Sequence, residues 1–220
     1  MTRILLSAFE PFDGATVNPS SEVAARLEVD PPPGVDLETV LLPVETEIAA
    51  ARLLEVWRRS GSTVVVMLGA ARGSATIRLE QVAINLRDFS IPDNAGKRVT
   101  DARVVDDGPD AHFATLPIAD LLTRLRKDDV PVERSLSAGT YLCNEVSFRM
   151  LHESKTAAAA GPSVSAGFVH LPSLPEQCED EDAPSMALGD QVAAVRTILE
   201  HLDRKSTRLN SSHANISYAV

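Results

Sequence analysis

The sequence predicts an α/β protein with a mostly parallel β-sheet and an antiparallel excursion. The central indication is the segment Thr63–Leu68, an uninterrupted and β-branched apolar run that is typical of a strand covered on both faces. A short apolar run at Ile4–Phe9 leads through a loop into helix-capping residues, which gives a strand, loop and helix unit. Between Ala75 and Leu86, apolar and polar residues alternate except around Gln81, and this alternation predicts antiparallel strands.

The other elements follow from capping residues, turn residues and apolar spacing. Ser20 or Ser21 is expected to cap the first helix, which runs to Leu27, and Ser185 is expected to cap the last. Taken in chain order, the remaining expected elements are a strand at Leu37–Leu42, a helix from Glu45 to Ser60, a turn at Pro92–Gly96, a helix at Ile118–Leu125, a strand at Val132–Leu136, a helix at Leu142–His152, a surface linker at Ser154–Ser163, a strand at Val164–His170 and a helix whose apolar stripe ends at Leu202.

The composition is that of one globular domain, which we expect to be residues 1–202. With 44% hydrophobic and 24% charged residues, the chain can bury a substantial core. A formal net charge of −10 argues against nucleic-acid binding, which needs clustered lysine and arginine. The apolar run at Ile4–Phe9 is too short for a signal peptide or a membrane span, so we expect a cytoplasmic protein. Cys143 and Cys178 are too few for a disulfide framework and are expected to be reduced thiols.

The last segment, Asp203–Val220, breaks the pattern of the preceding helix, because the apolar stripe stops and the composition turns to serine, asparagine and arginine. It resembles the in-frame translation of a sequencing-library adapter, with Ala214 and Asn215 where the variable barcode falls. The alternative is a native polar tail. We expect residues 203–220 to be a non-native, disordered tail and exclude them, His213 included, from the candidate sites.

Cys143 is the first candidate for catalytic chemistry. A strand at Val132–Leu136 and a glycine-containing turn precede it, and it lies in the first turn of the next helix. Unpaired N–H groups at a helix N-terminus stabilise a thiolate and can also bind an oxyanion. The alternative is an inert cysteine packed as a small apolar residue, since free cysteine is among the most buried residue types.

A catalytic thiol needs a base, and of the histidines before Asp203 only His170 ends a buried strand and precedes a proline. A strand-end histidine bonded to a backbone carbonyl is an equally common arrangement. A third group must orient the imidazole, and Glu80 and Asp93 both follow the central strand. Spacing alone leaves the choice between these two carboxylates open.

Four separate parts of the chain resemble one family. They are SAFEPFDGATVNPS, IRLEQVAINL with SIPDNAG, SAGTYLCN, and GFVHLPSLPEQ, which together extend from Ser7 to Gln177. In order and spacing they are similar to the pyroglutamyl peptidase I, or pyrrolidone carboxyl peptidase, family of cysteine exopeptidases. The resemblance implies a three-layer α/β/α sandwich that removes an N-terminal pyroglutamyl (5-oxoprolyl) residue from peptides through a thioester acyl-enzyme. It also implies a homodimer or homotetramer that needs neither a metal nor an organic cofactor.

The resemblance implies roles for individual residues. Cys143 is the expected nucleophile and His170 the expected general base and acid, and Glu80 is expected to orient His170, with Asp93 as the alternative. The matching positions of the substrate pocket are Phe9, Phe12, Ile91, Tyr141 and Leu142. Pyroglutamate is a small, uncharged lactam, so an apolar and aromatic pocket suits it.

Three positions depart from the family's pattern. Ser90 stands where the family commonly has arginine, and Gln81 replaces the usual basic residue after the glutamate. The usual Gly-Gly-Arg turn after Gly69 appears here as Ala71, Arg72 and Gly73. Two alternatives follow from these departures. The first is an enzyme with specificity shifted to other N-capped substrates, and the second is a non-catalytic protein that binds capped peptide ends.

Overall fold

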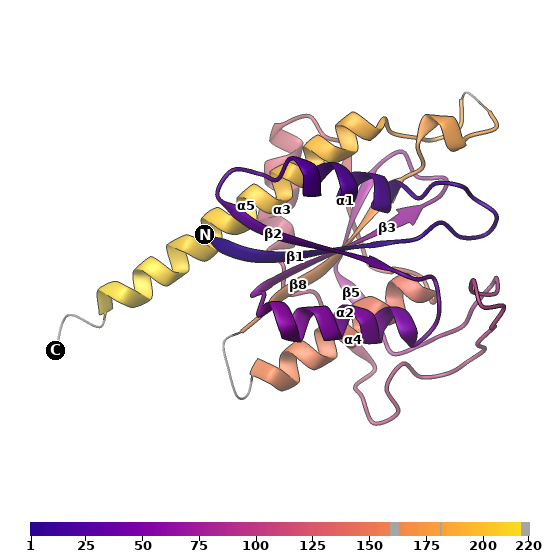
Figure 1. Ribbon diagram of the computed structural model, residues 1–220, viewed down its shortest axis with the longest axis horizontal. Coiled ribbons are helices and arrows are strands. Elements are labelled where there is room, and N and C mark those ends of the chain that lie inside the picture. The colour runs from indigo at the N-terminus through magenta and orange to yellow at the C-terminus, as the bar shows by residue number, and fades with distance from the viewer. Residues whose placement is uncertain (159–162, 181, 217–220) are drawn as a thin grey trace.

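The computed structural model describes residues 1–158, 163–180 and 182–216, with side chains as far as Lys205. A twisted β-sheet lies between two layers of helices (Figure 1). The strands are β1 (Thr2–Phe9), β2 (Val35–Leu42), β3 (Val64–Ala71), β4 (Ile77–Glu80), β5 (Val82–Ile84), β6 (Ala111–Phe113), β7 (Val132–Ser135) and β8 (Ser165–Pro172). The helices are α1 (Pro19–Val29), α2 (Ile48–Ser60), α3 (Ile118–Lys127), α4 (Leu142–Ala158) and α5 (Leu188–Ile216), with a 3₁₀ turn η1 at Pro175–Gln177.

The central sheet has the strand order β2-β1-β3-β8-β4-β7. The strands β2, β1, β3 and β8 are mutually parallel, whereas β4 is antiparallel to β8 and parallel to β7. A separate antiparallel pair, β5 with β6, lies outside this sheet. The predicted α/β class with a mostly parallel sheet and an antiparallel excursion is therefore confirmed.

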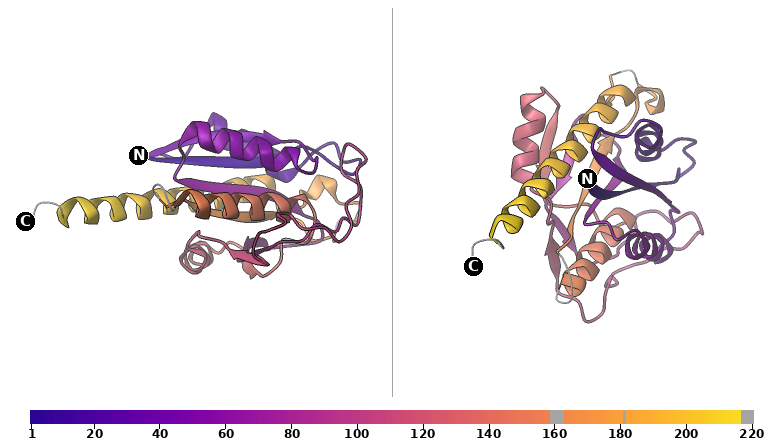
Figure 2. Two further views of the ribbon diagram at one scale, coloured as in Figure 1. Left: turned by 90° about the horizontal axis from the view of Figure 1, so that it is seen from below. Right: turned by 60° about the vertical axis from the view of Figure 1, so that its left-hand side comes forward.

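Each face of the sheet carries its own apolar core. Alternate residues of β1 point to opposite faces, so that Ile4 and Leu6 pack with α1, α3 and α5, whereas Leu5 packs with α2 and α4. The views in Figure 2 show the same separation of the helices into two layers. Among the described residues, no helix is long and apolar enough to cross a membrane.

Several predicted boundaries differ from the observed ones. The cap of α1 is Asn18, whose side chain accepts the Ser20 N–H, so the prediction of Ser20 or Ser21 was wrong. The side chain of Ser20 instead accepts the Phe9 N–H and ties the helix to β1. Strand β6 was not predicted, because three residues are too few to show a period.

The last two helices also differ from expectation. Helix α4 continues six residues past His152, so the predicted linker at Ser154–Ser163 was wrong at its start, while residues 159–162 lie outside the described part of the chain. Helix α5 begins at Leu188, where the Ala187 carbonyl accepts the Gln191 N–H, and not at a Ser185 cap. It runs past Leu202 to Ile216.

Candidate active site

The carboxyl ends of the central strands β3 and β8 meet the first turn of α4. The carboxyl ends of parallel strands are where α/β proteins place their sites. Cys143, the second residue of α4, is half-buried. A Cβ atom added to Gly69 in β3 would lie 3.0 Å from Cys143 Sγ, so the thiol packs directly on the β3 backbone. Gly69 is the register partner of His170 in β8. Glycine at position 69 thus lets the thiol approach the imidazole.

His170 is paired with a buried carboxylate. Its Nδ1 lies 2.8 Å from Glu80 Oε1, and both side chains are almost fully shielded from solvent. In the antiparallel pair of β4 and β8, Arg78 lies opposite His170 and Glu80 is the diagonal neighbour on the same face. Since a carboxylate only accepts hydrogen bonds, Nδ1 carries the proton in this pair. The other ring nitrogen, Nε2, is left for the thiol.

The surroundings of His170 favour its charged form. Burial alone lowers the pKa of His170, but the charge and hydrogen-bond interactions with Cys143 and Glu80 outweigh burial and raise this pKa to about 9. These interactions therefore stabilise the protonated imidazole. A positive charge beside a thiol is the setting that a cysteine nucleophile requires.

Asn144 fixes the start of α4 and was not predicted from the sequence. This fully buried side chain donates from Nδ2 to the Ile84 and Leu86 carbonyls at 2.8 and 2.9 Å, and its Oδ1 accepts the Ile84 N–H at 2.9 Å. All three bonds join α4 to the segment around β5. The signal available in the sequence was an asparagine directly after the candidate cysteine.

A small apolar pocket adjoins the thiol. Its lining residues are Phe9, Phe12, Asn18, Val44, Ala70, Tyr141, Leu142 and Cys143. Four of the five predicted pocket residues are therefore brought together beside Cys143. The fifth, Ile91, is half-buried but is not among the residues that line this pocket. Asn18, Val44 and Ala70 were missed, since nothing in their local sequence distinguishes them from ordinary loop and strand residues.

Aromatic packing holds the rim of this pocket. Tyr141 makes an edge-to-face contact with Phe89 at 4.7 Å between ring centroids, and its hydroxyl donates to the Pro92 carbonyl at 3.1 Å. Burial raises the pKa of Tyr141 to about 12, so the phenol stays a neutral donor. The rim is thereby joined to the loop that contains Asp93.

Asp93 holds this loop and does not contact the imidazole. The carboxylate is buried and accepts the backbone N–H groups of Thr46, Ala95 and Lys97 at 2.8 to 3.0 Å. Of the two carboxylates left open by the sequence, the geometry therefore puts Glu80 beside His170.

Comparison with known proteins supplies a family for this geometry. The sequence model described as pyroglutamyl peptidase matches residues 2–205. The chain belongs to this family. A pyrrolidone-carboxylate peptidase of Chromobacterium violaceum is 42% identical over 201 residues, which cover 91% of this chain and 92% of that relative.

Solved pyroglutamyl peptidase structures have the same fold. The pyrrolidone carboxyl peptidase of Fervidobacterium islandicum is 41% identical, covers 93% of this chain and 99% of its own, and has a TM-score of 0.87. The pyroglutamyl peptidase I of Bacillus amyloliquefaciens is 30% identical over 90% of this chain and 95% of its own, with a TM-score of 0.84. The family and the α/β/α arrangement predicted from the four sequence segments are confirmed.

The three departures of this pyroglutamyl peptidase family member lie at different places. The Ser90 carbonyl accepts a hydrogen bond from Arg98 at 2.6 Å. The backbone of Gln81 joins β7 to the segment after β6. Arg72 pairs with Asp13 at 2.7 Å, lies over the ring of Phe12 and is not among the residues that line the pocket beside the thiol.

Proposed function

We propose that this chain hydrolyses the bond after an N-terminal pyroglutamyl residue, with Cys143, His170 and Glu80 as its catalytic group. The observation that carries the proposal is the contact series from a half-buried thiol to a buried imidazole to a buried carboxylate, beside an apolar pocket. The names of the relatives, pyrrolidone-carboxylate peptidase and pyroglutamyl peptidase I, give the substrate class. Peptides with an N-terminal pyroglutamate are the expected substrates.

The mechanism follows from these contacts. The Cys143 thiolate attacks the pyroglutamyl carbonyl carbon, and the carbonyl oxygen becomes a tetrahedral oxyanion. Free N–H groups in the first turn of α4 receive this oxyanion, because the first four amides of a helix have no intrahelical partner. The His170 imidazolium then protonates the leaving amine, and the carbon–nitrogen bond breaks. Water activated by neutral His170 hydrolyses the thioester, which releases pyroglutamate and restores the thiol.

Glu80 acts through His170. A buried carboxylate at Nδ1 holds the ring in one orientation and one tautomer, so that Nε2 faces the thiol and the leaving group. The same negative charge stabilises the imidazolium that forms in each half of the reaction.

The pocket receives the lactam ring in this proposal. Phe9, Phe12, Tyr141 and Leu142 offer apolar surface, and pyroglutamate carries no charge that needs a partner. The space between the lining side chains is about 20 Å³, room for roughly one water molecule. The ring is larger than this, so substrate binding must displace a lining side chain, and we expect Phe12, which is half-buried in the loop after β1, to be the one that moves.

A reporter assay tests the function and separates the alternatives. The wild-type protein is expected to release the fluorophore from pyroglutamyl-aminomethylcoumarin, to lose this activity with iodoacetamide and to be protected by pyroglutamate. A panel of acetyl-, formyl- and pyroglutamyl-blocked peptides measures specificity. Cleavage of another cap in preference to pyroglutamate, or calorimetric binding without product, contradicts the proposal.

Assembly and location are separate proposals. The family resemblance supports a homodimer or homotetramer in the cytoplasm, without nucleic-acid or membrane partners. Light scattering of the purified protein at several concentrations measures the assembly directly.

A further inference from the structure

A second cleft lies next to the pocket and has no part in the reaction described above. Its volume is about 440 Å³, within the range of ligand-binding sites, which is roughly 300–1,000 Å³. It is lined by Gly14, Ala15, Thr16, Val17, Arg72, Ser173, Glu176 and Gln177. The loop after β1 and the segment that contains η1 extend from the same end of the molecule (Figure 1).

Three chain segments lead from the reaction centre to this cleft. In the loop after β1, Phe12 lines the pocket and Gly14, two residues later, lines the cleft. At the end of β3, Ala70 lines the pocket and Arg72, again two residues later, lines the cleft. In the third segment, Ser173 lines the cleft three residues after His170. Two or three extended residues span at most about 7–11 Å. A substrate peptide that continues from the scissile bond therefore reaches the cleft with its first few residues.

The two walls of the cleft are joined to each other. Gln177 Nε2 donates to the Val17 carbonyl at 2.9 Å, and Gln177 Oε1 accepts the Leu174 N–H at 2.9 Å. One side chain thus bridges the loop after β1 and the η1 segment. The cleft is formed before any peptide binds, which lowers the entropic cost of binding.

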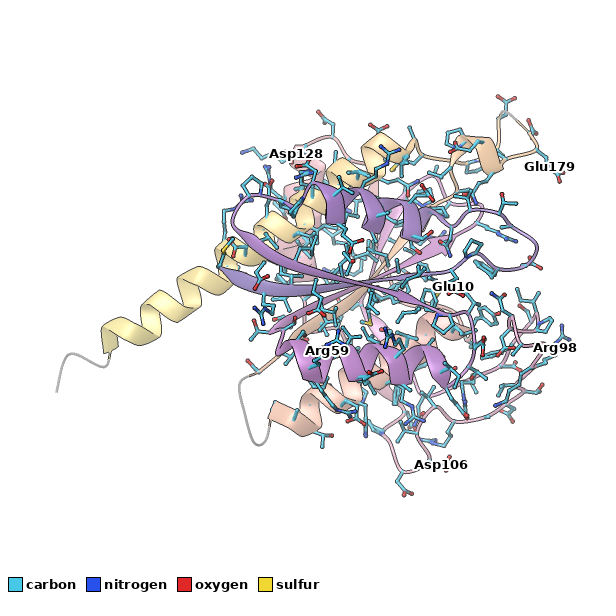
Figure 3. All side chains as sticks on the ribbon, in the orientation of Figure 1. Glu10, Arg59, Arg98, Asp106, Asp128 and Glu179 are labelled. Carbon is cyan, nitrogen blue, oxygen red and sulfur yellow. The ribbon has the colours of Figure 1, made fainter. Side chains whose placement is uncertain are left out.

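Within the described part of the chain, the lining of the cleft carries one basic and one acidic residue, Arg72 and Glu176. The charge of Arg72 is paired, because its guanidinium contacts the Asp13 carboxylate at 2.7 Å and lies 4.8 Å from the centroid of the Phe12 ring. Glu176 is exposed and has no ion pair within the described ranges. Glu179 is also exposed but is not among the residues that line the cleft, and Figure 3 shows it on the loop beyond η1.

We propose that this cleft binds the part of the peptide that follows the scissile bond, and that Glu176 selects a basic side chain there. The inference rests on the proposed function, since it concerns the leaving half of the same substrate. A lysine or arginine within the first three residues after pyroglutamate pairs with the Glu176 carboxylate, whereas an acidic residue is repelled by it.

Matched peptides test the inference. Alanine-based pyroglutamyl peptides carry lysine or glutamate at the first, second or third position after pyroglutamate, and kcat/KM is measured for each. The wild-type enzyme is expected to prefer lysine by roughly two- to fivefold at one of these positions, the size of an exposed charge interaction. Added salt is expected to reduce this ratio.

Two substitutions and one control assign the preference to Glu176. Glu176→Gln is expected to bring the lysine-to-glutamate ratio close to one, and Glu176→Lys to invert it. Glu179→Gln makes the same chemical change outside the cleft and is expected to keep the wild-type ratio. A ratio that is the same in the wild type, Glu176→Gln and Glu176→Lys overturns the inference.

The small coumarin reporter separates the two proposals. If the reporter and all peptides are left uncleaved, the proposed function fails and this inference fails with it. If the reporter is cleaved but lysine and glutamate peptides are cleaved equally well, the catalytic proposal stands and the cleft assignment is overturned.

Discussion

Glu80 reaches His170 across the single antiparallel contact of the central sheet, with 2.8 Å between Oε1 and Nδ1. The reversal of β4 relative to β8 makes Glu80 a diagonal neighbour of His170 on the face that also carries α4. The antiparallel excursion is thus the feature of the fold that brings the carboxylate to the imidazole.

Replacement of Glu80 by glutamine removes the charge and keeps the shape. We expect kcat/KM to fall roughly 10²-fold or more, because the imidazolium loses its buried counter-charge. The pKa of His170, about 9 in the wild type, falls as well. Activity that needs protonated His170 is lost as pH rises through this pKa, so the alkaline limb of the pH profile is expected to move to lower pH. Glu133→Gln, an exposed carboxylate on β7, is the control and is expected to leave the profile unchanged.

The same pair also predicts how stability depends on pH. The pKa of His170 rises from 6.5 to about 9 on folding. The resulting stabilisation is fully present below pH 6.5 and is lost as pH rises through about 9. Urea unfolding across this range measures the slope, which is expected to flatten in Glu80→Gln. An identical slope in the two proteins contradicts the coupling.

Asp93→Ala is expected to weaken the fold, because three backbone N–H groups lose their acceptor. The expected loss is about 3 kcal/mol of unfolding free energy, measured by urea denaturation. Any loss of kcat is expected to result from disorder of this loop and to be smaller than in Glu80→Gln. The alkaline limb of the pH profile is expected not to shift. If Asp93→Ala shifts that limb and leaves stability unchanged, Asp93 is the orienting group after all.

Gly69→Ala is expected to displace the thiol. The added methyl group would lie 2.7 Å from Phe168 Cζ and 3.0 Å from Cys143 Sγ, both closer than normal contact. Overpacking of this kind costs about 1–3 kcal/mol, and kcat is expected to fall because the sulfur moves relative to His170. Gly189→Ala in α5 meets no atom within 4 Å and is expected to stabilise the protein by about 0.5–1 kcal/mol with unchanged kcat. Equal effects of the two substitutions on kcat contradict the contact.

Asn144→Asp tests how α4 is positioned. The isosteric carboxylate cannot donate to the Ile84 and Leu86 carbonyls. These two carbonyl oxygens would then face a carboxylate oxygen in a buried site. We expect a loss of about 2–3 kcal/mol in unfolding free energy and a fall in kcat with little change in KM. Retained stability, measured by thermal and urea unfolding, argues against the anchoring role.

The sequence predicted the order of the main strands and helices, because continuous apolar runs of buried strands and the apolar spacing of amphipathic helices can be read locally. It did not predict strand β6, because three residues are too few to show a period. It also missed the Asn18 cap of α1, although an asparagine directly before Pro19 is a local signal for the start of a helix. The choice between Glu80 and Asp93 also required the structure. Both carboxylates follow the central strand, and only strand pairing decides which one meets His170.

The expectation that residues 203–220 are a translated adapter stays a prediction. The family match ends at residue 205. Asp203 accepts the backbone N–H of Thr2, and Lys205 pairs with Asp120. Sequencing of the genomic source across these codons checks the prediction, and recovery of the same codons there contradicts it.

The central claim is that Cys143 carries the pyroglutamyl group during turnover. Intact-protein and peptide mass spectrometry after acid quenching of the enzyme with a pyroglutamyl reporter tests this directly. The account predicts an added mass of one pyroglutamyl group on the Cys143 peptide of the wild type, and none on Cys143→Ala, which folds with unchanged circular dichroism and leaves the reporter uncleaved. Turnover by Cys143→Ala at the wild-type rate, or an acyl group on another residue, would contradict it.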